Sequence, residues 1–358
     1  MSFPAPTAAP AGPERHVVLG SGPAGTTLAA ELAGRGHHVR LVNRTGEGPA
    51  IPVPSHSTPS HSTPTTAATP TTTAATTTAA DAARGTVERY AADATDQEEL
   101  LRAITGATVV HHCVNVAYHL QTEVLPRVQE ALLGAVGETG ARLVVLDTLY
   151  PYGETGGAVM TEDSPWLATS RKGRMRARLD EAYLAAHRAG RARVVLGRAA
   201  DFVGPGVIGS SLGGAVFPGA ITGGDVLALG DIDLPHSHTY IGDVAVGLAT
   251  LAAHPEADGR VWHLPTAPAL TTRRIHAMIG ERVGRTLHAV VLDRPEPFGP
   301  FDETFMAEYA EMFYQHTEPQ IVDSSAFERD FGVRPTSMAA ALDATLAWYR
   351  AGLVAPRP

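Results

Sequence analysis

The apolar positions near the N-terminus form short runs separated by a helical pattern. Residues 16–20 are an apolar run closed by glycine, and residues 39–42 are a second run rich in valine and leucine. Between them, residues 24–33 carry apolar side chains at helical spacing, and Gly34 and Gly36 end the pattern. Short apolar runs on either side of such a stretch are typical of a strand, a helix and a second strand. We therefore predict a βαβ unit at the start of the ordered chain.

The same alternation continues to about residue 200. The predicted strands cover residues 86–90, 107–113, 142–147 and 193–197. The predicted helices run from a capping box at Thr95 to about Ile104, over residues 119–137, and over residues 170–189. Strands that alternate with helices favour an α/β fold with a parallel, doubly wound sheet. We assign this sheet to residues 15–200.

The pattern changes after Asp201. Glycine and proline cluster between residues 204 and 230, a helical pattern follows Asp243, and two more lie between residues 324 and 349. We interpret residues 201–358 as mainly a smaller C-terminal substrate-binding lobe, with some segments returning to the sheet.

Two segments cannot form a core. Residues 1–14 are rich in proline, and residues 54–80 contain only Pro, Ser, Thr, Ala and His. Such compositions predict a disordered leader and a disordered insertion. His56 and His61 lie in the insertion, but two histidines in a flexible loop make a metal-binding tract improbable.

Charge and cysteine content restrict the function classes. The 358 residues include 28 basic and 37 acidic side chains, a net charge of −9, which argues against nucleic acid or a membrane surface as a partner. A single cysteine excludes a disulfide framework, and no apolar run approaches the ~20 residues of a membrane span. We expect a cytoplasmic protein. Only one of the basic residues is a lysine, Lys172.

A glycine-rich motif follows the first predicted strand. Gly20, Gly22 and Gly25 have the Gly-x-Gly-x-x-Gly spacing, with Ser21 and Ala24 between them. The glycines permit a tight turn, close approach of the backbone to a pyrophosphate, and close packing of helix on strand. Because the motif follows a strand and opens a helix, it predicts a Rossmann-type dinucleotide site.

The residues after the second strand indicate which dinucleotide binds. An acidic residue there would favour NAD, but this chain has Asn43 and Arg44. An arginine can pair with the 2′-phosphate of NADP, so we favour NADP over NAD. The alternative is that Arg44 is a solvated loop cation. Asp93 is expected on the adenine side.

Four stretches of the chain resemble known motifs. They are residues 147–153, which end in Tyr-Pro-Tyr-Gly, and residues 161–165, 197–206 and 238–245. On these stretches the chain resembles the extended short-chain dehydrogenase/reductase superfamily, in its NAD-dependent epimerase/dehydratase branch. The resemblance covers most of residues 15–350, apart from the insertion.

The resemblance implies catalytic positions. It places Thr148 at the Ser/Thr position, which bonds a substrate carbonyl. It places Lys172 at the lysine of Tyr-x-x-x-Lys, which holds the nicotinamide ribose. The tyrosine of that motif would stand at position 168, where this chain has Ala168. Hydride transfer to a ketone needs a proton donor, which alanine cannot supply.

Three explanations for the missing tyrosine at position 168 remain open. Tyr150, Tyr152 or Tyr118 could donate the proton, Lys172 could stabilise the oxyanion directly, or the chemistry is not ketone reduction. Tyr118 and Asn115 follow a strand at the carboxyl edge of the sheet, where ligands bind in such folds. We count Asn115 among the cofactor-binding residues.

Two further clusters carry weaker signals. His236 and His238 have the spacing that places both on one face of a strand, but no third ligand is evident, so no metal is predicted. The arginines of the 170–189 helix form a basic run that suits a solvated or subunit-contact face. They are Arg171, Arg174, Arg176 and Arg178.

These observations favour an NADP-dependent oxidoreductase or epimerase that acts on a small organic carbonyl or alcohol, such as an intermediate of secondary metabolism. The alternatives are a non-redox lyase, dehydratase, isomerase or cyclase on the same scaffold, and a non-catalytic NADP-sensing protein. The resemblance also implies a homodimer, formed through residues 119–138 and 170–189.

Overall fold

The computed structural model describes residues 13–51 and 85–354. The predicted leader up to residue 12, the 54–80 insertion, and His56 and His61 lie outside the described residues. None of the described helices combines the length and apolar character that a membrane crossing requires.

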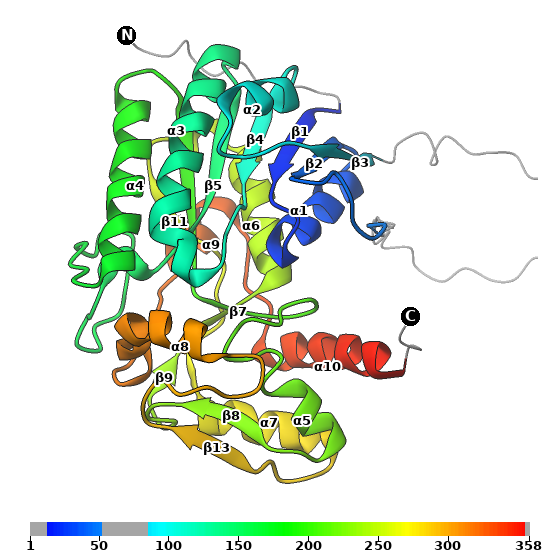
Figure 1. Ribbon diagram of the computed structural model, residues 1–358, viewed down its shortest axis with the longest axis vertical. Helices are drawn as coiled ribbons and strands as arrows, with labels where there is room; N and C mark the ends of the chain where they lie inside the picture. Colours follow the sequence, from blue (N-terminus) through cyan, green and yellow to red (C-terminus); the bar gives the residue numbers. More distant parts are fainter. Residues whose placement is uncertain (1–12, 52–84, 355–358) are drawn as a thin grey trace, which may run out of the picture.

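Seven parallel strands form the central sheet, in the order β11-β6-β5-β4-β1-β2-β3 (Figure 1). These strands are β1 (Arg15–Leu19), β2 (His38–Asn43), β3 (Thr86–Ala91), β4 (Val109–His112), β5 (Arg142–Thr148), β6 (Arg193–Ala199) and β11 (Val261–His263). The strand order reverses between β1 and β4, which both pair in parallel register. This arrangement confirms the predicted Rossmann-type doubly wound sheet.

Helices cover both faces of the sheet (Figure 1). One face packs against α1 (Pro23–Gly34), α6 (Ile241–Ala253) and α9 (Ser325–Phe331). The other packs against α2 (Gln97–Ile104), α3 (Gln121–Thr139) and α4 (Arg171–Arg188). The cap of α2 differs from the predicted box at Thr95, because the Asp96 side chain accepts the hydrogen bond from the Glu99 amide.

A second layer of structure lies beyond the carboxyl ends of the strands (Figure 1). It contains the parallel pair β8 (Val226–Leu229) and β13 (Ala289–Leu292), and the helices α5 (Phe217–Thr222), α7 (Thr272–Val283), α8 (Glu303–Tyr309) and α10 (Met338–Val354). Short pairs connect it to the main sheet: β7 (Asp201–Val203) with β10 (His238–Tyr240), and β9 (Pro235–His236) with β12 (Leu270–Thr271). The described residues also form short 3-10 helices: η2 (Tyr118–Leu120), η3 (Tyr150–Tyr152), η4 (Pro255–Ala257) and the longer η5 (Ala310–His316).

A buried ion cluster fixes α4 against the sheet. The Arg198 guanidinium on β6 donates to Asp147 on β5 at 2.7 Å and to Asp180 on α4 at 2.7 Å. All three side chains are almost fully buried. Because an unpaired buried charge is costly, the cluster holds the end of β5 in one position relative to α4.

Candidate active site

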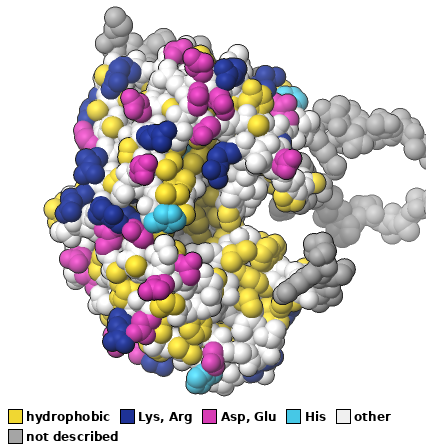
Figure 2. Space-filling view, viewed as in Figure 1, with side chains coloured by type: hydrophobic (Ala, Val, Ile, Leu, Met, Phe, Trp, Pro, Cys, Tyr) yellow, Lys and Arg dark blue, Asp and Glu magenta, His cyan; other side chains and the backbone are white. Residues whose placement is uncertain are grey.

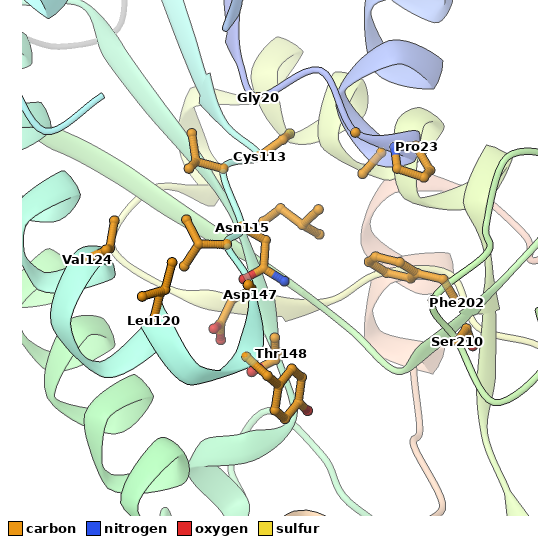
Figure 3. Close-up of a pocket in the computed structure, with 18 of the residues that line it drawn as sticks. Gly20, Pro23, Cys113, Asn115, Leu120, Val124, Asp147, Thr148, Phe202 and Ser210 are labelled. Atoms are coloured by element: carbon orange, nitrogen blue, oxygen red, sulfur yellow. The ribbon is translucent and has the colours of Figure 1, made fainter. Parts of the chain in front are cut away.

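A cavity of about 1020 Å³ lies between the sheet and the second layer. It opens at the carboxyl ends of β1 and β4, where the strand order reverses, which is the usual ligand position in this type of fold. Figure 2 shows the hollow between the two parts of the molecule, with hydrophobic side chains on its walls. In Figure 3, Gly20 and Pro23 lie at the top and Thr148 lies lower down. Phe202 and Ser210 lie on the right, opposite Leu120 and Val124.

The glycine-rich turn lines this cavity, and each glycine has a distinct geometric reason. Gly20 has a φ of +100°, and a β-carbon there would lie 2.6 Å from the Cys113 carbonyl oxygen. A β-carbon on Gly25 would lie 1.9 Å from the Gly20 carbonyl oxygen. A β-carbon on Gly22 would meet no protein atom within 4 Å, because Gly22 faces the open cavity. The turn therefore combines tight packing on one side with an accessible backbone on the other.

The end of β2 supports the turn and carries a free cation. The Asn43 side chain donates to the Ser21 hydroxyl at 2.9 Å and to the Glu47 carbonyl at 2.8 Å. Arg44 is exposed and lines the cavity beside it. Asp93 also lines the cavity, and hydrogen bonds from Thr95 lower the pKa of its carboxyl group. Asn43 thus holds the turn in place, whereas Arg44 and Asp93 present their charges to the cavity.

Asn115 and Arg176 meet at the centre of the cavity wall. An Arg176 amino group lies 3.4 Å from the Asn115 side-chain oxygen, and Gln121 donates to the same oxygen at 3.2 Å. Arg176 is only 7% exposed, and its buried Nε has no hydrogen-bond partner within the described residues. The structure thus corrects the prediction that Arg176 belongs to a solvated or subunit-contact face. The missed signal is its position one helical turn after Lys172, which places both on the same side of α4.

Two tyrosines come together where the cavity meets the second layer. The hydroxyl groups of Tyr118 and Tyr150 are hydrogen-bonded to each other, and both side chains line the cavity with Thr148. Burial raises the pKa of Tyr150 to about 12 and the pKa of Tyr118 well above its ordinary value. Both phenols are therefore protonated near neutral pH, so the pair can donate a proton but cannot act as a ready base. Tyr309, which the sequence analysis did not find, lines the same wall.

Lys172 lies behind the cavity wall. Its side chain is fully buried, and its ammonium donates to Glu308 at 2.5 Å and to Glu311 at 2.9 Å. It is not among the residues that line the cavity, and its nitrogen lies over the ring of Tyr118, 5.1 Å from the centroid. The acidic side chains of α8 and η5 enclose Lys172, and its contact with the cavity wall runs through Tyr118.

Tyr152 is also separated from the cavity. Its hydroxyl bonds His263 at 2.6 Å and the Thr161 carbonyl at 3.0 Å, and its ring packs against the Arg198 guanidinium. The side chain is 1% exposed. Of the three candidate tyrosines, the structure therefore brings Tyr118 and Tyr150 into the site and assigns Tyr152 a packing role.

Comparison with known families agrees with this geometry. Residues 17–264 match the NAD-dependent epimerase/dehydratase family, and they include the glycine turn and the strands that form the cavity floor. The chain belongs to this family. Membership confirms the resemblance and the prediction of an enzyme. No curated protein matches the sequence at a significant level.

Several solved structures share the fold of this epimerase/dehydratase family member. A double mutant of DesIV, a dTDP-glucose 4,6-dehydratase from Streptomyces venezuelae, aligns with a TM-score of 0.68 and 21% identity, covering 94% of this chain and 97% of that one. A UDP-glucose 4-epimerase from Thermotoga maritima aligns with a TM-score of 0.70 and 16% identity, covering 95% and 99%. An epimerase from Methanothermobacter thermautotrophicus gives a TM-score of 0.73 at 15% identity, covering 96% and 94%. At these identities the likeness establishes the fold.

Proposed function

We propose that this family member is an NADP-dependent oxidoreductase or epimerase that acts on a small organic carbonyl or alcohol. The observation that carries the proposal is the shared cavity: the open backbone at Gly22, the Arg176 cation, and the Thr148 and Tyr150 hydroxyls all face it. The solved DesIV structure is described with NAD bound, which supports a nicotinamide dinucleotide in the corresponding place.

The residues that would bind the dinucleotide are spread along the cavity from one end to the other. The amides at the start of α1 and the Gly22 backbone would hold the pyrophosphate. Arg44 and Asp93 would meet the adenosine end, and Asn115 and Arg176 would lie near the nicotinamide end. A bound nicotinamide supplies or accepts a hydride. The protein must then orient the substrate and handle the proton.

Tyr150 is the best-placed proton donor. When a hydride is added to a carbonyl carbon, the oxygen gains negative charge and needs a proton. The Tyr150 phenol can give that proton, while Thr148 and Arg176 offer a hydrogen bond and a positive charge to the oxygen. Tyr118 holds the Tyr150 hydroxyl through their mutual hydrogen bond, and Lys172 supports the Tyr118 ring from beneath. Oxidation of an alcohol would need Tyr150 as its phenolate, so the raised pKa of Tyr150 favours the carbonyl-to-alcohol direction near neutral pH.

The substrate end favours a compact and weakly charged molecule. Aromatic and aliphatic side chains make up much of its wall, together with the polar Ser210, Ser211 and Gln315. Among the described residues, the arginines that line the cavity all belong to the strand ends, α3 and α4, not to the second layer. The apolar side chains that α8 and the segments beside it contribute to the wall include Leu229, Phe301, Phe305, Met306 and Tyr309. A sugar pyrophosphate would find no cation there, so we propose a small carbonyl or alcohol, although several solved relatives act on nucleotide sugars.

The preference for NADP is tested at Arg44. We expect Arg44→Ala to weaken NADPH binding by about 10- to 100-fold, the range of one charge-assisted hydrogen bond, and to leave NADH binding within about twofold. Calorimetric titration with each dinucleotide measures both affinities. Arg102→Ala, on the exposed side of α2, is the matched control and should change neither. Equal losses for NADPH and NADH in Arg44→Ala would overturn the NADP assignment, and no binding of either dinucleotide to the unmodified protein would overturn the redox proposal.

A further inference from the structure

A cluster of imidazoles and one carboxylate lies at the wall between the cavity and the second layer. Asp201 begins β7, His236 ends β9 and His238 begins β10. The parallel pairing of β7 with β10 places His238 opposite Asp201. One ligand atom from each of the three side chains lies within 4.8 Å of the other two. Asp201 supplies the third ligand that the sequence pattern of His236 and His238 lacked.

The hydrogen bonds of His236 point to a cation in this cluster. Its Nδ1 lies 3.1 Å from the Gln315 carbonyl oxygen, which can only accept, so Nδ1 carries the proton. In the neutral ring, Nε2 then presents a lone pair to the Asp201 carboxylate, whose oxygen is 3.1 Å away. Two acceptors at this distance repel unless a proton or a metal ion lies between them. Two ligands of a tetrahedral metal, each at about 2.0–2.1 Å from it, are about 3.3 Å apart.

His238 gives a second, independent observation. It is 4% exposed, and its Nδ1 is buried without any hydrogen-bond partner in the described structure. A buried polar atom without a partner is costly, and an imidazole nitrogen is a preferred ligand of transition metals. The other nitrogen, Nε2, lies at 3.5 Å from the Ser211 hydroxyl.

The surroundings of the cluster suit a bound ion. The Gln315 carbonyl fixes the His236 ring, which is the usual support for a metal-bound histidine. His316 stacks on His236 and bonds the Tyr309 hydroxyl at 2.6 Å. A second cavity, of about 10 Å³, adjoins the His236 and His238 rings and Ser211. It has room for one water molecule as a fourth ligand.

We propose that Asp201, His236 and His238 bind one divalent transition-metal ion of the zinc type. Two neutral imidazoles and a carboxylate match the ligand chemistry of Zn²⁺, and the fourth position would be held by water. The site would join β7, β9 and β10 at the substrate end of the cavity, because Asp201 also lines that cavity. The proposal goes beyond the redox function and does not depend on which dinucleotide binds.

The test is zinc binding by the full chain, freed of any purification tag and dialysed against a chelator. The protein is titrated with Zn²⁺, and the bound zinc is counted by elemental analysis after gel filtration. We expect the wild-type chain to hold one more zinc than His238→Ala, whose affinity at this site should fall at least 100-fold. Loading with Co²⁺ should give the visible absorption of a tetrahedral site in the wild type and not in His238→Ala.

Two further variants make the result decisive. Asp201→Asn keeps the shape of the side chain and removes its charge, so it should also lose the zinc even if His238→Ala folds poorly. His16→Ala is the control, because Glu14, His16 and His37 form a separate acid-and-imidazole group at the opposite edge of the sheet. Replacing His16 should leave the zinc at Asp201, His236 and His238 in place. Equal zinc content in the wild type, His238→Ala and Asp201→Asn would overturn the proposal, whereas unchanged NADPH affinity in all variants would leave the redox function intact.

Discussion

The two ends of the cavity are built in different ways. The dinucleotide end is mostly backbone: six consecutive residues form the turn, and the end of β2 supports it. The substrate end is made of side chains from segments far apart in the chain, with Tyr118, Tyr150 and Tyr309 meeting on one wall. A site that is made by local backbone geometry can therefore be predicted from a short sequence motif. A site made by distant side chains depends on how whole elements pack.

The largest effect should come from the turn itself. Gly25→Ala would place a methyl group 1.9 Å from the Gly20 carbonyl oxygen, so we expect the loss of measurable NADPH binding and a lower Tm. Gly22→Ala tests cofactor binding more specifically than Gly25→Ala, because its methyl group meets no protein atom within 4 Å. It should keep the wild-type Tm and still weaken NADPH binding at least tenfold by obstructing the phosphates. Wild-type affinity in Gly22→Ala would show that the cofactor does not approach the turn.

The next effect concerns the tyrosine pair. Tyr150→Phe removes the proposed donor and should lower turnover by about 100- to 10,000-fold, with a stability loss of about 1 kcal/mol for the bond to Tyr118. Turnover is measured as NADPH oxidation against a panel of small aldehydes and ketones. Tyr152→Phe is the matched control: its hydroxyl bonds His263 away from the cavity, so stability should fall while turnover stays within about twofold. If both variants lose activity equally, the assignment of Tyr150 fails.

A smaller effect, on folding stability, distinguishes whether Lys172 supports the cavity wall or binds the cofactor. Lys172→Gln leaves Glu308 and Glu311 without their buried partner and should cost about 2–3 kcal/mol of folding free energy at neutral pH, less than a fully buried pair because both carboxylates are partly solvated. NADPH affinity should stay within about twofold. A loss of NADPH affinity with unchanged stability would return Lys172 to the cofactor site.

The pH dependence of that stability follows from the two carboxyl groups. The hydrogen bond from Lys172 lowers the pKa of Glu308. Burial alone would raise the pKa of Glu311, but the hydrogen bond and charge of Lys172 outweigh it and the net pKa is lowered. A depressed carboxyl pKa contributes stability above the unfolded value of about 4.3, and this contribution is lost as the pH falls. The difference between wild type and Lys172→Gln in urea unfolding should therefore shrink below about pH 4.3. A constant difference down to pH 3 would contradict the pairing.

The sequence predicted the sheet and the turn because both follow local rules. Apolar runs, glycine spacing and the Asn43-Arg44 pair lie within short windows. The structure forms strands from the apolar runs and places the glycine turn and the Asn43-Arg44 pair at the carboxyl ends of β1 and β2. The sequence could not predict which turn of α4 reaches the cavity. A shift of one helical turn exchanges Lys172 for Arg176, and only the packing of α8 and η5 against α4 decides between them. The Asp201 ligand was missed for the same reason, since β7 and β10 pair across more than thirty residues of chain.

The enclosure of Lys172 has a practical consequence. It is the only lysine of the sequence, and in the folded protein its amine is sealed beneath α8 and η5. A mild acylating reagent can modify this amine only when that segment opens. The rate of acylation, followed by mass spectrometry on the peptide that carries position 172, therefore reports how often the aromatic wall of the cavity lifts away from α4. A substrate that packs against that wall should slow the labelling, so one native side chain can serve as a built-in reporter of occupancy in a screen where the substrate is still being sought.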